Sequence, residues 1–311
     1  MEKAEAMAKA KAKAKATASM AGLVVLITGG ASGIGAAAAA ALAAKGAIPV
    51  LVDCDGELLK RTASVLSVTS FCADVTSMAA CEALVAQTIA RYGRIDVVWA
   101  NAGIASFGPL LLTDIAAWQR CVEVNVFGTL NIVRAALPAV IAQCGYVLAT
   151  ASISSFAHPP AVSSYAASKA AVEAMCNSWR IELAAHGVGV GTIYASWVQT
   201  PLVTEGEMHP AFVRLKHTTP ALLRRVMPVD RAADLIVKGI SRRARRIWVP
   251  GWVRMLHWFR AALHTRWAER PLLQAAPEME QLFMQTVVSS GAKASSVAPR
   301  ELARQHHEQS G

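Results

Sequence analysis

Residues 22–35 read Gly-Leu-Val-Val-Leu-Ile-Thr-Gly-Gly-Ala-Ser-Gly-Ile-Gly. The apolar run up to Thr28 is short and unbroken, which is typical of a strand buried within a parallel sheet. An alanine-rich segment then runs to about Ala44, and Gly46 ends the helix that this segment predicts. A glycine-rich turn between strand and helix lets the backbone approach a phosphate and offers it the free amides of the helix start. We therefore expect this stretch to bind a dinucleotide.

The alternation of strand and helix that begins here continues along the chain. Further strands are predicted at Ile48–Asp53 and at residues 68–73, 94–100, 146–151, 188–194 and 246–249. Further helices are predicted at residues 77–91, 114–141, 165–185 and 230–241. This pattern predicts an α/β fold, with a doubly wound parallel sheet of about seven strands that binds its ligand at the carboxyl ends of the strands.

The second and fourth predicted strands are followed by residues that suit a dinucleotide. Asp53 stands 18 positions after Gly35, where a carboxylate can accept hydrogen bonds from the adenosine ribose and would repel a 2′-phosphate. Because no arginine or lysine stands in the glycine-rich turn or directly after Asp53, NAD(H) is favoured over NADP(H). The alternative is that Asp53 caps the next helix, a position that Asp55 suits better. Beyond the fourth strand, Gly103 lets the backbone lie against a flat cofactor, and Asn101 can tie neighbouring strand ends together.

A tyrosine and a lysine, Tyr165 and Lys169, stand four positions apart in a predicted helix and therefore share one face. The usual pKa of tyrosine is about 10, so its phenol is a poor base near neutral pH. A neighbouring ammonium favours the phenolate, which is the direction that a catalytic tyrosine needs. Reaching a pKa of about 7 takes roughly 4 kcal/mol, so a cationic cofactor ring would have to add to the effect of one lysine. The alternative is a solvated lysine whose stem packs along the ring.

Ser152 and Asn125 are two further polar residues whose positions in the sequence suggest a function. Ser152 follows the fifth predicted strand, 13 residues before Tyr165. Asn125 lies inside an apolar helical region, where an amide is either a satisfied core group or a functional one. His158, in the loop after Ser152, suggests a Ser/His hydrolase, but no Gly-x-Ser-x-Gly turn surrounds that serine, so we reject this interpretation.

Together these residues resemble the short-chain dehydrogenase/reductase family over residues 22–250. The family's catalytic tetrad is matched in order and spacing by Asn125, Ser152, Tyr165 and Lys169. The predicted cofactor-binding residues are Thr28, Gly29, Ser32, Gly33, Ile34, Gly35, Asp53, Asp74, Val75, Asn101, Ala102, Gly103, Tyr165, Lys169, Val198 and Thr200. The resemblance implies a Rossmann fold and an NAD(P)-dependent oxidoreductase, with no metal in its site.

The resemblance also implies a mechanism in which hydride moves between a substrate carbon and a nicotinamide ring. Tyr165 would take the alcohol proton during oxidation or donate a proton to the carbonyl during reduction, and Ser152 would hold the same oxygen. Lys169 would bind the nicotinamide ribose and lower the pKa of Tyr165. Asn125, through a backbone kink and a water molecule, would link Lys169 to solvent. A homodimer or homotetramer formed through the long helices is implied as well.

The chain departs from the family pattern in two places. Ala195-Ser196 stands where the family usually has Pro-Gly, close to the expected nicotinamide position, whereas Val198 and Thr200 match the positions that hold the carboxamide. The family's frequent glycine-rich ending after the last strand is absent. The chain instead continues for about 60 residues beyond Pro250.

The length and composition of the chain limit the number of domains that it can form. The chain has 311 residues, 54% hydrophobic and 17% charged, which suits one large core with flanking segments. We expect a disordered basic tail at residues 1–20, a Rossmann-fold dehydrogenase domain at 21–250 and a helical extension at 251–311. No window of about 20 strongly apolar residues is uninterrupted, so no transmembrane helix is predicted.

Six scattered cysteines form no Cys-x-x-Cys pair, which indicates reduced thiols and neither a disulfide framework nor a zinc site. The amino end lacks the apolar segment of a secretory signal, and we expect a cytoplasmic protein.

The formal net charge of +10 gathers partly in residues 242–270. A single amphipathic helix is predicted at residues 251–267, with an apolar face of Trp252, Met255, Leu256, Phe259, Leu263 and Trp267 and a basic face of Arg254, His257, Arg260 and His264. Arg242, Arg243, Arg245, Arg246, Arg266 and Arg270 are expected to surround it. Such a helix can lie peripherally in a membrane interface, or it can dock over the substrate cleft or a neighbouring subunit. Both interpretations stay open, and nucleic-acid binding is not expected, because no recognised motif accompanies the charge.

The leading hypothesis is thus an NAD(H)-dependent dehydrogenase or reductase for a small, lipophilic secondary alcohol or ketone. The apolar character of the substrate is inferred from Met208, Phe212 and Leu215 in the segment after the sixth strand, and from the extension. The competing hypothesis is a catalytically weak dinucleotide-binding protein that acts as a membrane-associated scaffold or regulator. It is motivated by Ala195-Ser196 and by the basic extension.

Overall fold

The computed structural model describes residues 20–219, 221 and 223–296, so nearly all of the predicted basic tail lies outside the described residues. One sheet of seven strands forms the centre, in the order β3-β2-β1-β4-β5-β6-β7, and all neighbouring strands are parallel. The strands are β1 (Val24–Thr28), β2 (Ile48–Asp53), β3 (Thr69–Cys72), β4 (Val97–Ala100), β5 (Tyr146–Ser152), β6 (Gly189–Ala195) and β7 (Arg246–Val249). The predicted doubly wound Rossmann sheet is confirmed.

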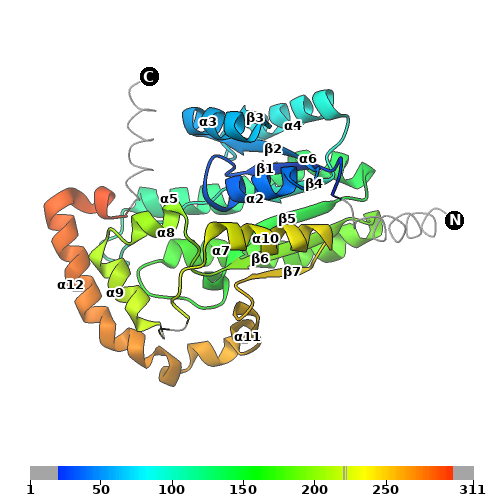
Figure 1. Cartoon of the computed structure of the whole chain (residues 1–311). Coiled ribbons are helices and arrows are strands. Elements are labelled where there is room, and N and C mark those ends of the chain that lie inside the picture. Colours follow the sequence, from blue (N-terminus) through cyan, green and yellow to red (C-terminus); the bar gives the residue numbers. More distant parts are fainter. Residues whose placement is uncertain (1–19, 220, 222, 297–311) are drawn as a thin grey trace.

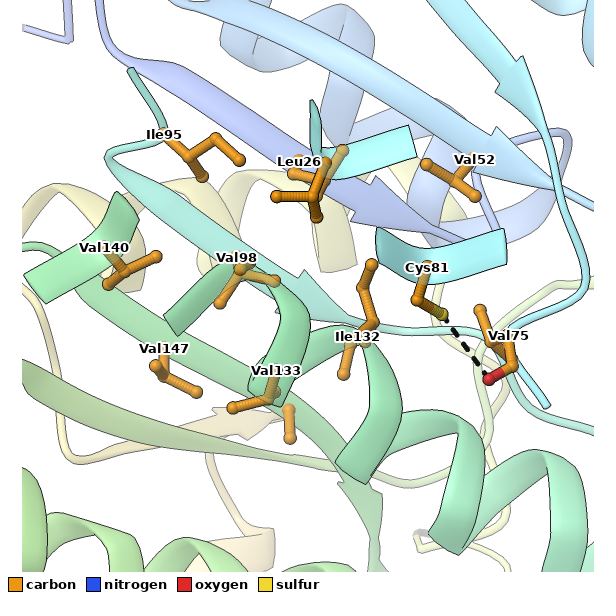
Figure 2. Packing of buried hydrophobic residues seen from close by; sticks show 14 of the residues in the cluster. Leu26, Val52, Val75, Cys81, Ile95, Val98, Ile132, Val133, Val140 and Val147 are labelled. Atoms are coloured by element: carbon orange, nitrogen blue, oxygen red, sulfur yellow. Dashed lines mark hydrogen bonds between the residues drawn. The ribbon is translucent and has the colours of Figure 1, made fainter. Parts of the chain in front are cut away.

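Helices cover both faces of this sheet (Figure 1). One face carries α4 (Met78–Tyr92), α6 (Gly128–Ala142) and α7 (Ser163–Glu182), and the other carries α2 (Gly33–Ala43), α3 (Gly56–Leu66) and α10 (Val229–Ser241). Figure 2 shows the first of these layers, in which Ile132 and Val133 of α6 meet Val98 of β4 and Cys81 of α4. The continuous apolar strands are explained by this burial on both faces.

The order of the strands reverses at β1, which lies between β2 and β4. In such sheets a crevice opens at the carboxyl ends of the strands at the reversal, because the connections leave in opposite directions. The sheet therefore provides a ligand site beyond Thr28 and Ala100, the last residues of these two central strands.

Residues 115–142 form one helical segment built from α5 (Ile115–Val122), a π-helical turn η1 (Glu123–Phe127) and α6. Among the described residues it is the one helix long and apolar enough to cross a membrane, with a mean hydropathy of 1.5. The sequence analysis predicted no such segment. Ile132, Val133 and Val140 of this helix lie in the core against the sheet, and this packing accounts for its apolar character.

The extension after β7 corrects the single helix predicted at residues 251–267. It consists of α11 (Val253–Trp258), a 3₁₀ turn η4 (Arg260–His264) and the helical segment α12 (Arg266–Ser296), which is interrupted by a kink at Gly291. The breaks fall at Phe259 and at Thr265, whose backbone is extended. α12 packs against α9 (Pro210–Thr218) at the rim of the molecule, where Met279 and Phe283 are buried (Figure 1).

The arginines of residues 242–270 do not form one group, contrary to the sequence-based expectation. Arg243 donates hydrogen bonds to the carbonyls of Gly145 and Gly187, which precede β5 and β6. The arginines before β7, Arg242, Arg243 and Arg245, therefore lie at the amino edge of the sheet, whereas α11 follows the carboxyl end of β7. Arg246 begins β7 and interacts electrostatically with His257 of α11, so it lies between the two sets.

Candidate functional site

A groove of about 260 Å³ lies at the carboxyl ends of the central strands. Of the predicted cofactor-binding residues, it is lined by Gly29, Ser32, Gly33, Ile34, Asp53, Asp74, Val75, Asn101, Ala102, Gly103, Tyr165, Lys169, Val198 and Thr200. Residues separated by up to 171 positions thus meet in one place, because parallel strands bring their ends to one edge of the sheet. Thr28, Gly35 and Asn125 do not line the groove, and each has a supporting role described below.

The glycine-rich turn fits a pyrophosphate. A Cβ atom on Gly29 would lie 2.9 Å from Cα of Ala102, and one on Gly35 would lie 2.3 Å from the carbonyl oxygen of Gly29. The turn can therefore keep its close packing only without side chains at these positions. Ser32 precedes α2 without a side-chain hydrogen bond to the helix, and Ser32, Gly33 and Ile34 line the groove, so the start of this helix can offer its amides to an anion there.

The ends of β1 and β4 are tied together by hydrogen bonds. The hydroxyl oxygen of Thr28 accepts from the backbone amides of Asn101 at 2.9 Å and of Ala102 at 3.0 Å. The side-chain amide of Asn101 donates to the carbonyl of Thr28 at 3.0 Å, and its oxygen accepts from the hydroxyl of Thr150 at 3.1 Å. Asn101 therefore links three neighbouring strand ends, as the sequence predicts.

Asp53 lies at the end of β2 beside the glycine-rich turn. One carboxylate oxygen accepts a hydrogen bond from the amide of Ala31 at 3.1 Å, and the other accepts from the amide of Asp55 at 3.1 Å. Asp55, and not Asp53, caps α3, because its side chain accepts from the amide of Leu58 at 3.0 Å. The carboxylate of Asp53 is thus held in the groove wall, and its predicted contact with a ribose stays a prediction.

Arg120 of α5 is a groove residue that the sequence analysis did not find. Its guanidinium donates to a carboxylate oxygen of Asp74 at 2.7 Å and to the hydroxyl of Thr76 at 3.2 Å. Burial raises the pKa of Asp74, but the hydrogen bonds from Arg120 and Thr76 outweigh it and hold this pKa below its usual value. A cation therefore lines the groove at its Asp74 end, although none stands near Asp53 in sequence.

Three of the four predicted catalytic residues line the groove, and the fourth lies directly behind them. Ser152 and Tyr165 line both the groove and a second cavity, so these two hydroxyls stand where the two spaces meet. The side-chain oxygen of Ser152 accepts from the amide of Ser154 at 3.1 Å and donates to the carbonyl of Ala195 at 3.3 Å. These bonds fix Ser152 at the end of β5.

Lys169 is buried, and its ammonium donates to the carbonyl of Thr150 at 2.8 Å and lies 5.5 Å from the centre of the Tyr165 ring. Burial lowers the pKa of Lys169 to about 8. Burial also raises the pKa of Tyr165 to about 12, although its interaction with the hydroxyl of Ser152 offsets part of this shift. The pKa of Tyr165 thus lies above its usual value, whereas the sequence predicts that Lys169 lowers it. The reason is that burial outweighs the hydrogen bond with Ser152.

Asn125 lies at the centre of the π-helical turn η1 and is fully buried. Its side-chain amide donates to the carbonyl of Ile104 and to the hydroxyl of Ser168, both at 2.9 Å, and its oxygen accepts from the amide of Ile104 at 2.9 Å. The predicted backbone kink is therefore present, and the residue joins α7 to the loop after β4. A Cβ atom on Gly103 would lie 3.1 Å from the ammonium of Lys169, which explains the glycine there.

The second cavity, of about 290 Å³, lies beside Ser152 and Tyr165. Its walls are mostly apolar and come from two sources: Phe107, Val162, Leu202, Phe212 and Leu215 of the domain, and Trp252, Leu256, Leu263 and Leu272 of the extension. The extension therefore docks over this cavity, which is one of the two interpretations that the sequence left open. His158, considered above for a hydrolase, stacks on His264 at 4.7 Å and lines the far side.

Ser196, one of the two departures from the family pattern, lines both cavities. Its amide donates to the carbonyl of Val249 at 2.8 Å, whereas its side-chain oxygen is buried without a hydrogen-bond partner in the described chain. A buried hydroxyl without a partner is unfavourable in the protein alone, so a ligand in either space would gain a polar contact here.

A family model described as short chain dehydrogenase matches residues 23–210. An uncharacterised oxidoreductase of Listeria innocua is 36% identical over 188 residues, which are 58% of this chain and 76% of that protein. 11-beta-hydroxysteroid dehydrogenase A of Sesamum indicum is 30% identical over 256 residues, 77% of this chain and 72% of that protein. The crystal structure of a short chain dehydrogenase/reductase from Burkholderia phymatum in complex with NAD aligns with a TM-score of 0.70 at 26% identity, covering 79% of this chain and 97% of that one.

Proposed function

The chain belongs to the short-chain dehydrogenase family, and from this premise we propose that it interconverts a lipophilic secondary alcohol and its ketone with NAD(H). The observation that carries the proposal is that Ser152 and Tyr165 line both the cofactor groove and the apolar cavity. A substrate in the cavity and a nicotinamide cofactor in the groove would meet at these two hydroxyls. The bound cofactor would supply or accept the hydride.

The protein's own contribution would be to orient the substrate and to move one proton. In the reducing direction, the phenol of Tyr165 would donate its proton to the carbonyl oxygen. The hydroxyl of Ser152 would turn from the carbonyl of Ala195 and donate its hydrogen bond to the same substrate oxygen. The high pKa of Tyr165, about 12, supports this direction, because the phenol then keeps its proton at neutral pH. For oxidation the phenol must first lose that proton, which the ammonium of Lys169 favours.

Preference for NAD(H) over NADP(H) is proposed from Asp53. Its carboxylate is held in the groove wall by the amides of Ala31 and Asp55, and a 2′-phosphate beside it would meet negative charge. Arg120 does not compensate, because its guanidinium is paired with Asp74. The Burkholderia phymatum structure, which is in complex with NAD, supports a nicotinamide cofactor in this groove.

The proposed substrate is lipophilic because the cavity beside Tyr165 is lined mainly by leucine, phenylalanine, valine and tryptophan side chains. Burial of a substrate against apolar walls strengthens its binding by about 0.8 kcal/mol for each buried methylene group. Activity should therefore rise with chain length along a series of 2-ketones until the cavity is full.

The test is a fluorescence titration of the protein with NADH and NADPH, followed by turnover with paired 2-ketones and 2-alcohols of increasing length. We expect NADH to bind at least about tenfold more tightly than NADPH, and turnover to favour the longer ketones. An Asp53→Ser variant should narrow the difference between the cofactors by improving NADPH binding. Equal binding of both cofactors by the unaltered protein would contradict the role of Asp53, and lack of turnover on the whole panel would contradict the proposed reaction.

A further inference from the structure

The outer side of the extension carries aromatic and arginine side chains that no other described part of the chain covers. Trp258 is 78% exposed, Phe259 61% and Trp267 86%. Arg254, Arg266 and Arg270 are exposed beside them. We call these six residues the outer surface of the extension. Three large aromatic residues so exposed within one short stretch of chain are characteristic of a binding surface.

The inner side of the same segment is already packed, so the two sides have different tasks. In α11, Val253, Leu256 and His257 face the domain, and His257 lies against the rings of Phe156 and Tyr194. Arg254 and Trp258 are four positions apart and lie together on the opposite side. At the start of α12, Arg266 and Arg270 share a side in the same way, with Trp267 next to them. Folding of the domain therefore does not explain the exposed aromatic residues.

We propose that the outer surface of the extension binds peripherally to an anionic lipid bilayer. Tryptophan and phenylalanine partition into the interface between headgroups and acyl chains, and arginines beside them meet the lipid phosphates. Of the acidic residues, the sequence places only Glu269 between positions 254 and 270, so the charge of this segment complements a negative membrane surface. Figure 1 shows α11 and α12 at the outer rim of the fold, where a flat bilayer can approach them.

A second copy of the chain is the competing occupant, and the charges argue against it. A two-fold contact would place Arg254, Arg266 and Arg270 of one copy near the same arginines of the other. Like charges brought together in this way repel one another. Arg260 would not relieve this repulsion, because its guanidinium is also positively charged and already pairs with Glu173 at 3.1 Å.

The outer surface of the extension lies close to the proposed substrate cavity. Trp252, Leu256 and Leu263 line the apolar cavity from within the same stretch of chain that carries the outer surface. A bilayer at the outer surface would therefore lie within the thickness of one helix of the cavity wall. Membrane binding at this surface would not depend on the proposed reaction.

The test is co-sedimentation of the full-length protein with sucrose-loaded phosphatidylcholine vesicles. One set of vesicles contains no anionic lipid, and the other contains about 30 mol% phosphatidylserine, which makes its surface negative. We expect binding to the anionic vesicles that weakens as salt rises. A Trp258→Ser/Phe259→Ser/Trp267→Ser variant should lose at least about 100-fold in partitioning. An Arg254→Gln/Arg266→Gln/Arg270→Gln variant should lose about fivefold for each arginine on anionic vesicles only.

The matched control is Val65→Ser/Ile181→Ser, because these apolar side chains are 83% and 80% exposed on α3 and α7. It should bind as the unaltered protein does, and thermal unfolding should show that all variants are folded. Equal sedimentation of the control and the aromatic variant would overturn the proposal, as would absence of binding to anionic vesicles. A change of oligomeric mass in the aromatic variant, measured by light scattering, would assign the surface to a second copy and likewise overturn it.

Discussion

At the scale of single residues, the site depends on how burial shifts the two proton-carrying groups in opposite directions. The enclosed phenol of Tyr165 has a pKa of about 12, and the buried ammonium of Lys169 has a pKa of about 8. Both shifts oppose the charged form, since each group has left water for a less polar environment. Burial therefore favours the neutral form of each group, so the phenol keeps its proton at neutral pH and the ammonium loses its proton at a lower pH than in water.

Removing the phenol oxygen should separate chemistry from cofactor binding. A Tyr165→Phe variant keeps the ring in place but has no proton to donate, so kcat should fall by about 10²–10⁴-fold. Binding of NADH, measured by fluorescence titration, should stay within about threefold, because the groove is lined mainly by backbone and by other side chains. Unchanged kcat would show that another group transfers the proton.

The pH dependence of ketone reduction should report the ammonium of Lys169. Its pKa of about 8 lies below that of Tyr165, so it is the first of the two groups to lose its proton as the pH rises. We expect kcat/KM for reduction to be flat between pH 6 and about 7.5 and to fall above about pH 8. A Lys169→Arg variant should move this fall to higher pH, because the guanidinium keeps its charge. An identical profile in that variant would exclude the lysine as its origin.

The sequence predicted the residues of this site better than it predicted their electrostatics. Tyr165, Lys169 and Ser152 could be found from their spacing, because a helical turn and a strand end fix their positions locally. Arg120 could not, since its contact with Asp74 spans 46 positions and depends on how α5 lies over the groove. The rise in the pKa of Tyr165 could not be predicted from the sequence either, because burial is a property of the complete fold.

At the scale of elements, one buried acid fastens the extension to the domain. Glu173 of α7 has a side chain that is 7% exposed, and it accepts from the guanidinium of Arg260 at 3.1 Å and contacts Nε2 of His257 at 3.4 Å. The three residues join α7, α11 and η4. Because Arg260 is half exposed, water weakens its share of the interaction.

Replacing Glu173 should loosen this attachment. A Glu173→Ala variant leaves His257 without its partner, and we expect a loss of about 1–2 kcal/mol in the free energy of unfolding, measured with urea. Amide hydrogen exchange should increase first in α11 and η4. The control is Glu57→Ala, which removes an ion pair with Lys60 whose two side chains are 75% and 77% exposed and should change stability very little. Equal losses in both variants would contradict the role of Glu173.

The elements of the sheet could be predicted closely, and the extension could not. The strands Ile48–Asp53 and Arg246–Val249 match their predicted bounds, because apolar runs between turn residues carry enough local information. In the extension, helical spacing continues through Phe259 and Thr265, where the chain in fact leaves the helix. The inner side of this segment follows the surface of the domain, and such tertiary packing overrides the local pattern.

At the scale of the whole molecule, the two ligand spaces are built by different parts of the chain. The cofactor groove is lined by residues between Gly29 and Glu205, whereas the apolar cavity takes part of its wall from Trp252 to Leu272. Changes in the extension should therefore alter substrate selection and leave cofactor binding as it is.

Neighbouring leucines of α12 allow a direct test of this division. Leu272 lines the apolar cavity, whereas Leu273 is 62% exposed. Leu272→Ala should raise KM for the longest 2-ketone accepted by about tenfold, because the shortened side chain no longer packs against the end of the substrate, and should leave the Kd for NADH unchanged. Leu273→Ala should change neither quantity. If both variants raise KM equally, the wall assigned to Leu272 is wrong.

The extension is attached to the domain by packing and by a few polar contacts. This attachment affects how the substrate range of such an enzyme can diversify. All four predicted catalytic residues and the whole lining of the cofactor groove precede Pro250, and the later residues contribute only walls of the apolar cavity. A mutation after that point can thus be tried without endangering the reaction itself. Recombining this carboxyl-terminal segment between relatives would exchange substrate ranges on an unchanged catalytic scaffold, and the same segment is the natural starting point for a directed library.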